Sequence, residues 1–174
     1  MKKSTERKYL PEFVFGAIDG AVTTFAVVAG AMGASLSPLI ILILGFANLF
    51  ADGFSMAMSD YLSIKSENQI QKSYRHKHFK NPRKAAFVTF FAFVIVGLIP
   101  LISFVIALFA PFIDNHKFIY SMILTGISFL VIGSVKGEVV GKEKVHSAIE
   151  TFIVGTLAAL IAFVVGYVVR GIVV

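Results

Sequence analysis

Residues 20–51 form a run of 32 positions without a single Lys, Arg, Asp or Glu. As one helix they would extend about 48 Å, whereas the hydrocarbon core of a bilayer is about 30 Å thick. One membrane span therefore cannot use the whole run. A break is predicted at 33–38, where Gly33 can end one helix, Ser37 can cap the next, and Pro38 suits its first turn. The run thus predicts a tight hairpin of two membrane helices.

The rest of the chain repeats this pattern. With 57% hydrophobic residues, 15% charged residues and a mean hydropathy of +0.84, the chain has too little polar surface for a soluble globule. Further charge-free runs cover 85–113, 118–135 and 151–169. We therefore predict an all-α integral membrane protein that forms one transporter domain over 1–174, with a short basic linker at about 65–81. Its five spans are predicted at roughly 12–34, 38–64, 82–110, 118–137 and 146–172.

Basic residues predict the orientation of these spans. By the positive-inside rule the N-terminus is cytoplasmic and the C-terminus is outside or luminal, as five spans require. Lys117 and Arg170 are the only basic residues predicted on the outer side. These flanks also account for the net charge of +6, so we expect no nucleic-acid partner, and we expect the stretch 72–84 to contact anionic lipid headgroups. The predicted cytoplasmic cations are Lys2, Lys3, Arg7, Lys8, Lys65, Lys72, Arg75, Lys77, Lys80, Arg83, Lys84, Lys136, Lys142 and Lys144.

Two aspartates lie inside the predicted hairpin. An ionisable group at membrane depth costs at least a few kcal/mol and by default suggests a functional site. Asp19 and Asp52 lie 16 and 17 residues from the turn near Ser35, so we expect similar depths. Helical spacing places Glu12 and Asp19 on one polar stripe, and Asn48, Asp52 and Met56 on another.

Carboxylate oxygens combined with a thioether sulfur favour a divalent first-row transition metal over Ca²⁺ or Mg²⁺. A proton and a metal can compete for a carboxylate in an apolar setting, which is the basis of proton-coupled antiport. Asp19, Met56 and either Asp52 or Asn48 are too few for a closed site, but a two-fold dimer with the first span at its axis would double them. Gly16 and Gly20 are spaced for close helix approach there.

Structural roles remain open for each of these residues. Met56 can serve packing alone, Asp52 can bond to Asn48 or a neighbouring serine, and Asp19 can be purely structural. His76 and His78 lie among basic residues, where a positive field opposes metal capture. With no cysteines, thiolate metal sites and thiol catalysis are excluded.

A longer segment carries a resemblance to a known family. Residues 15–67, FGAIDGAVTTFAVVAGAMGASLSPLIILILGFANLFADGFSMAMSDYLSIKSE, resemble the signature hairpin of the vacuolar iron transporter family. Members move Fe²⁺ or Mn²⁺ out of the cytosol in exchange for protons, as dimers with the path at the two-fold axis. The resemblance implies that Asp19 and Met56 are intramembrane metal ligands and that Glu12 is the acidic residue at the cytoplasmic mouth.

This chain departs from the family pattern in two places. Iron-transporting members often carry a metal-binding domain between spans two and three, where this chain has a short basic linker over 65–84. Asn48 stands where such members have a glutamate, while Asp52 supplies an acid where they have a small residue. The resemblance therefore leaves the choice between iron and manganese open.

The predicted function is proton-coupled export of Fe²⁺ or Mn²⁺ from the cytosol by a homodimer, without enzymatic activity and without a cofactor beyond the transported metal. The expected location is the plasma membrane in a prokaryote and a vacuolar or other internal membrane in a eukaryote. A non-transporting metal sensor or scaffold is the alternative, and a passive channel is a third possibility. These alternatives differ in whether metal flux occurs and whether it depends on a proton gradient.

Overall fold

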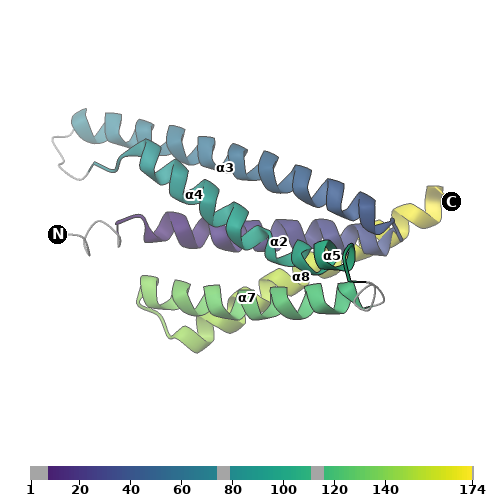
Figure 1. The fold of residues 1–174 in the computed structure, drawn as a ribbon. Helices are drawn as coiled ribbons and strands as arrows, with labels where there is room; N and C mark the ends of the chain where they lie inside the picture. The colour runs from purple at the N-terminus through teal and green to yellow at the C-terminus, as the bar shows by residue number, and fades with distance from the viewer. Residues whose placement is uncertain (1–7, 74–78, 111–115, 174) are drawn as a thin grey trace.

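The computed structural model describes residues 8–73, 79–110 and 116–173. These ranges are helical and contain no strand (Figure 1). Four helices are long and apolar enough to cross a membrane, and a bent helix pair raises the number of candidate crossings to five. An all-α membrane protein is therefore confirmed. Its helices are α2 (Leu10–Gly33), α3 (Pro38–Ser73), α4 (Pro82–Gly97), α5 (Ile99–Ala107), α7 (Lys117–Val140) and α8 (Lys144–Val173).

Helix α3 is longer than the predicted second span. It continues to Ser73, past the predicted end at 64, so the first part of the expected linker is helical. The apolar run ends near Ile64, but the next residues are good helix formers, and Gln71 Nε2 donates a 2.9 Å hydrogen bond to Glu67 Oε1 one turn back. The helix therefore continues beyond the end of the apolar run that defined the predicted span. The predictions for residues 1–7 and 74–78, including His76 and His78, lie outside the described residues, as does the side chain of Lys72.

The predicted third span is broken in the middle. Helices α4 and α5 meet at Leu98 with a bend of 43°. Pro100 follows at the start of α5, and a proline has no N–H to donate to the preceding turn. The Pro100 carbonyl accepts a 2.6 Å hydrogen bond from the buried Ser121 hydroxyl of α7. Pro100 therefore accounts for the bend, and α7 holds the bent segment in place.

The turn between α2 and α3 forms where it was predicted, and α2 ends at Gly33 as expected. Ser35, with φ of 55°, takes the left-handed conformation, whereas Gly33 is the last residue of α2. A methyl group at Gly33 would overlap the Phe163 carbonyl oxygen, so glycine is needed there for the close approach of α8. Ser37 Oγ accepts from the Ile40 N–H at 3.5 Å, and Arg170 of α8 donates to the Ser35 hydroxyl.

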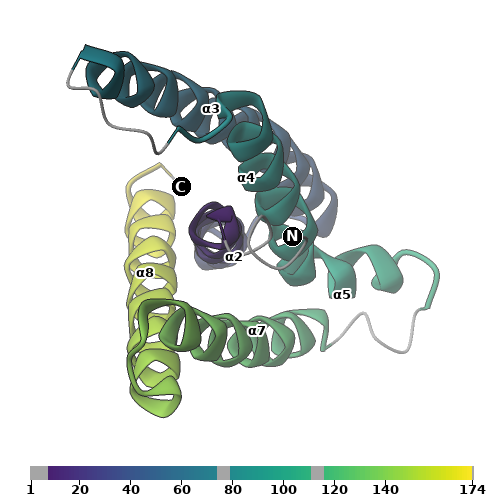
Figure 2. The same cartoon turned by 90° about the vertical axis from the view of Figure 1, so that its left-hand side faces the viewer.

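Helix α2 passes through the middle of the bundle, with α4, α7 and α8 around it (Figure 2). Its main neighbours are α4 and α8, and α3 also packs mainly against α4. Methyl groups at Gly16 and Gly20 would overlap the carbonyl oxygens of Thr89 and Phe93. The expectation that these two glycines face a dimer axis is therefore wrong. They allow α4 to approach α2 within one chain, because only helices without intervening side chains can come this close.

The charged side chains separate toward the two ends of the bundle. Helices α2, α4 and α8 begin at the end where α3 and α7 finish, and α8 finishes at the opposite end (Figure 1). Lys117 and Arg170 belong to that opposite end. The first end contains most of the described basic residues, namely Lys8, Lys65, Lys80, Arg83, Lys84, Lys136, Lys142 and Lys144.

Candidate metal-binding site

Asp19 and Asp52 come from different helices and act on each other electrostatically. Asp19 lies on the buried α2 and is half-buried, whereas Asp52 is exposed on α3. The two carboxylates are near enough to repel one another. Neither takes part in an ion pair with any described residue. Two like charges in a largely apolar region are costly without a counter-ion, so this pair suits a cation or a shared proton.

The side chains on either side of Asp52 form an incomplete ligand set. Met56 and Asn48 are half-buried one helical turn from Asp52, in opposite directions. Asn48 Nδ2 is buried and has no hydrogen-bond partner among the described residues, so it does not donate to Asp52. The suggested structural bond between these two residues is thus absent. Gly45, about one turn before Asn48 on α3, is buried against Leu101 of α5.

Glu12, the predicted acid of the cytoplasmic mouth, is 7% exposed and paired with a lysine. The Lys80 ammonium lies 2.6 Å from Glu12 Oε1, while Glu12 Oε2 is buried without a partner among the described residues. Lys80 is held in turn because its carbonyl accepts a 2.7 Å hydrogen bond from Asn68 Nδ2 of α3. The mouth acid is therefore covered by a cation of the same chain. The sequence gives no local sign of this contact, because 68 residues separate its partners.

A further acid, Asp60, lies on α3 toward its C-terminal end. Its Oδ2 accepts a 2.7 Å hydrogen bond from Thr89 Oγ1, and Thr89 is fully buried on α4. Asp60 therefore has a structural partner, unlike Asp19 and Asp52. Its position in the sequence does not distinguish Asp60 from the other two acids, because its partner Thr89 lies 29 residues away on another helix.

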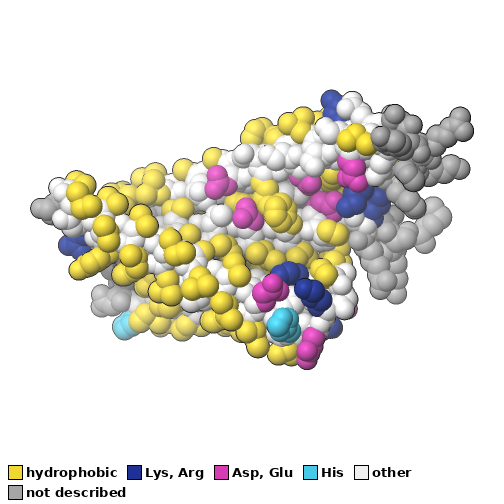
Figure 3. Space-filling view, turned by 180° about the vertical axis from the view of Figure 1, so that it is seen from behind, with side chains coloured by type: hydrophobic (Ala, Val, Ile, Leu, Met, Phe, Trp, Pro, Cys, Tyr) yellow, Lys and Arg dark blue, Asp and Glu magenta, His cyan; other side chains and the backbone are white. Residues whose placement is uncertain are grey.

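Acidic side chains lie within a mainly hydrophobic face of the molecule, apart from the charged groups at one end (Figure 3). Across the described ranges, no three His, Cys, Asp or Glu side chains come close enough to hold a metal ion. The described residues of a single copy therefore do not form a closed site of three such ligands.

These features define a class of protein. Apolar helices that pack closely through glycines are typical of a multi-pass membrane protein. Carboxylates within such helices that have no partner among the described residues are typical of one that binds or transports cations. Comparison with known sequences narrows this class. The sequence model of the VIT family matches residues 10–80 and 72–167, so the chain belongs to the VIT family.

Curated relatives cover nearly the whole chain at low identity. "Vacuolar iron transporter" of Plasmodium berghei (strain Anka) is 23% identical over 226 residues, which cover 94% of this chain and 83% of the relative. "Vacuolar iron transporter homolog 4" of Arabidopsis thaliana is 28% identical over 171 residues, covering 92% and 83%. "Vacuolar iron transporter 1" of Arabidopsis thaliana is 24% identical over 227 residues, covering 97% and 89%.

The alignments also locate a difference in length. Two of these relatives align over more positions than the 174 residues of this chain, so they carry segments that it lacks, whereas homolog 4 aligns over 171. The two matches to the family model overlap at 72–80, which is where α3 gives way to the linker before α4. The overlap of the two matches falls within the linker predicted at about 65–81.

Proposed function

We propose that this protein exports Fe²⁺ or Mn²⁺ from the cytosol in exchange for protons, as a homodimer. The observation that carries the proposal is the pair Asp19 and Asp52, which belong to neighbouring helices and have no cationic partner among the described residues. Membership of the VIT family and relatives named vacuolar iron transporters support metal transport across a membrane.

In this proposal Asp19 and Met56 are the principal ligands. The carboxylate supplies charge, and the thioether favours a transition metal over Ca²⁺ and Mg²⁺. Asp52 and Asn48 line the path beside them. A proton on Asp19 yields to cytosolic metal, and protons from the other side then displace the metal after the site changes its exposure. The exposed position of Asp52 leaves room for ligands from a second copy of the chain.

The clustering of described basic residues at the end that contains the N-terminus of α2 supports a cytoplasmic placement of that end. Glu12 then lies at the cytoplasmic mouth, where metal arrives. Relatives named for the vacuole support an internal membrane if the source is eukaryotic, and the plasma membrane is the expected place in a prokaryote.

Metal uptake by proteoliposomes under an imposed pH gradient tests this function. Wild type and Asp19→Asn are compared for Fe²⁺, Mn²⁺, Co²⁺ and Zn²⁺, with Asp60→Asn as a matched control because Asp60 already has Thr89 as its partner. We expect gradient-dependent flux that Asp19→Asn abolishes and Asp60→Asn retains. Flux that ignores the gradient would indicate a channel, and metal binding without flux would indicate a sensor or scaffold.

A further inference from the structure

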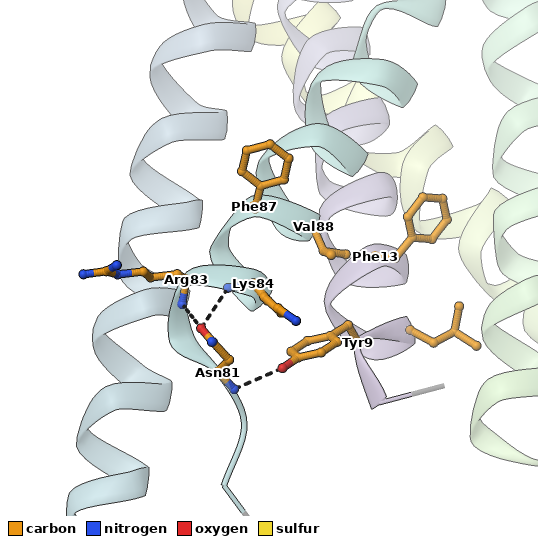
Figure 4. Close-up of a pocket in the computed structure, with 8 residues that line it drawn as sticks. Tyr9, Phe13, Asn81, Arg83, Lys84, Phe87 and Val88 are labelled. Carbon is orange, nitrogen blue, oxygen red and sulfur yellow. Dashed lines mark hydrogen bonds between the residues drawn. The ribbon is translucent and has the colours of Figure 1, made fainter. Parts of the chain in front are cut away.

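A groove lies at the basic end of the bundle, apart from the candidate metal site. It is formed by the first turns of α2 and α4 and has a cavity volume of about 740 Å³ (Figure 4). That volume lies within the range of roughly 300–1,000 Å³ typical of small-molecule sites. The groove is lined by Tyr9, Leu10, Phe13, Asn81, Arg83, Lys84, Phe87 and Val88.

The groove has a polar end and an apolar end. Tyr9, Asn81 and Lys84 lie at the polar end. Phe13 and Phe87 lie about one turn further along their helices, or roughly 5 Å along the helix axes toward the middle of the molecule. Phe13 is 41% exposed and Phe87 is 65% exposed, so both rings are free to contact a ligand. A polar group followed along the helices by an apolar wall matches the order of headgroup and acyl chain in a phospholipid.

Two groups at the polar end are available to a ligand. The Lys84 side chain points into the groove, and it has no acidic partner among the described residues (Figure 4). The Tyr9 hydroxyl accepts a 3.0 Å hydrogen bond from the Asn81 N–H, so its own proton remains free for donation. An ammonium and a hydroxyl donor together favour a phosphate oxygen. None of the described residues that line the groove is an acid, so their charge complements an anionic ligand.

The neighbouring arginine provides an internal comparison. Arg83 belongs to the same turn of α4, but its side chain points away from Phe13 and Tyr9 (Figure 4). The Asn81 side chain already caps this turn by accepting from the Arg83 and Lys84 N–H groups at 3.0 and 3.3 Å. The free end of α4 is therefore not the anion site. Arg83 also borders the groove, but of these two cations only Lys84 directs its side chain into it.

We propose that this groove binds one anionic phospholipid, with the phosphate on Lys84 and Tyr9 and an acyl chain along Phe13 and Phe87. The inference goes beyond metal transport and uses none of the candidate metal ligands. It assigns to the α2–α4 groove a binding role distinct from general attraction between the basic end and an anionic membrane surface.

Native mass spectrometry of the purified full chain tests the proposal in detergent without metal or a pH gradient. Phosphatidylglycerol and phosphatidylcholine with identical chains are titrated against wild type, Lys84→Gln and Arg83→Gln. We expect one phosphatidylglycerol to bind preferentially to wild type, and Lys84→Gln to weaken this binding roughly fivefold. Arg83→Gln removes the same charge from the same turn and should leave the preference nearly unchanged.

A second pair of variants tests the apolar wall. Phe87→Ala should weaken both lipids alike and keep the headgroup preference, whereas Ile95→Ala, on an exposed part of α4 outside the groove, should change neither. Equal losses in Lys84→Gln and Arg83→Gln would overturn the proposal in favour of diffuse surface charge. Equal binding of the two lipids to wild type would also overturn it, as would a loss of dimer in Lys84→Gln without loss of lipid, which would make the groove an interface between two copies.

Discussion

The Lys80 ammonium lies 2.6 Å from Glu12 Oε1 and thereby joins the end of the linker to the first turn of α2. Two further contacts join the same two segments. Lys8 Nζ donates to the Phe79 carbonyl at 2.5 Å, and the Asn81 N–H donates to the Tyr9 hydroxyl. The residues before α4 are thus fastened to the start of α2, where the proposed path for metal begins.

The Lys80–Glu12 pair should contribute to stability. Lys80→Met leaves a carboxylate that is buried and unpaired, and we expect a loss of about 1–3 kcal/mol, below the range for a fully buried pair because the Lys80 side chain is 34% exposed. The double variant Glu12→Gln/Lys80→Met should lose less than the sum of the two single variants. Thermal unfolding of all four proteins in one detergent measures this coupling, and strictly additive losses would contradict it.

If two copies share one metal path, a single defective copy should inactivate the dimer. When wild type and Asp19→Asn subunits are mixed in equal amounts before assembly, flux should fall to about a quarter of the wild-type value, because only dimers with two intact copies remain active. Independent paths in each copy predict about a half. Flux from tagged and co-purified mixtures at several ratios distinguishes the two relationships.

Metal uptake should depend on the thioether sulfur of Met56. Met56→Leu keeps nearly the same volume and removes the thioether, so we expect Fe²⁺ or Mn²⁺ uptake to fall severalfold while thermal stability changes by less than about 1.5 kcal/mol. Met58→Leu is the control, because Met58 lies two residues away on α3, belongs to no proposed ligand set and is 38% exposed. Equal uptake by both variants would reduce Met56 to a packing residue.

The α2–α4 contact should be intolerant of any side chain at Gly20. A methyl group there would overlap the Phe93 carbonyl oxygen, which belongs to a helix backbone and cannot move aside alone. Gly20→Ala should therefore destabilise the protein by about 1–3 kcal/mol. Gly171→Ala, where nothing lies within 4 Å of the added methyl, should be neutral or slightly stabilising. Melting temperatures of both variants check this difference.

Local patterns were sufficient to predict the membrane class and the hairpin, and a local feature, Pro100, also accounts for the bend of the third span. Charge-free runs longer than a bilayer, a proline without an N–H and turn residues at 33–38 act through neighbouring residues, so their effect is visible in the chain itself. The same holds for the unusual acids Asp19 and Asp52, because a charge in an apolar run needs no partner to be noticed.

The partners of each helix face were decided only by the packing. Spacing placed Gly16 and Gly20 on one side of α2, but the structure assigns that side to α4 of the same chain and not to a second copy. Likewise, Glu12 is covered by Lys80, and among the described residues the Asp60 carboxylate accepts a hydrogen bond from a hydroxyl group whereas the Asp19 carboxylate does not. Helical periodicity determines which residues share a face, whereas the neighbour of that face depends on contacts between segments far apart in the chain, which only the folded arrangement brings together.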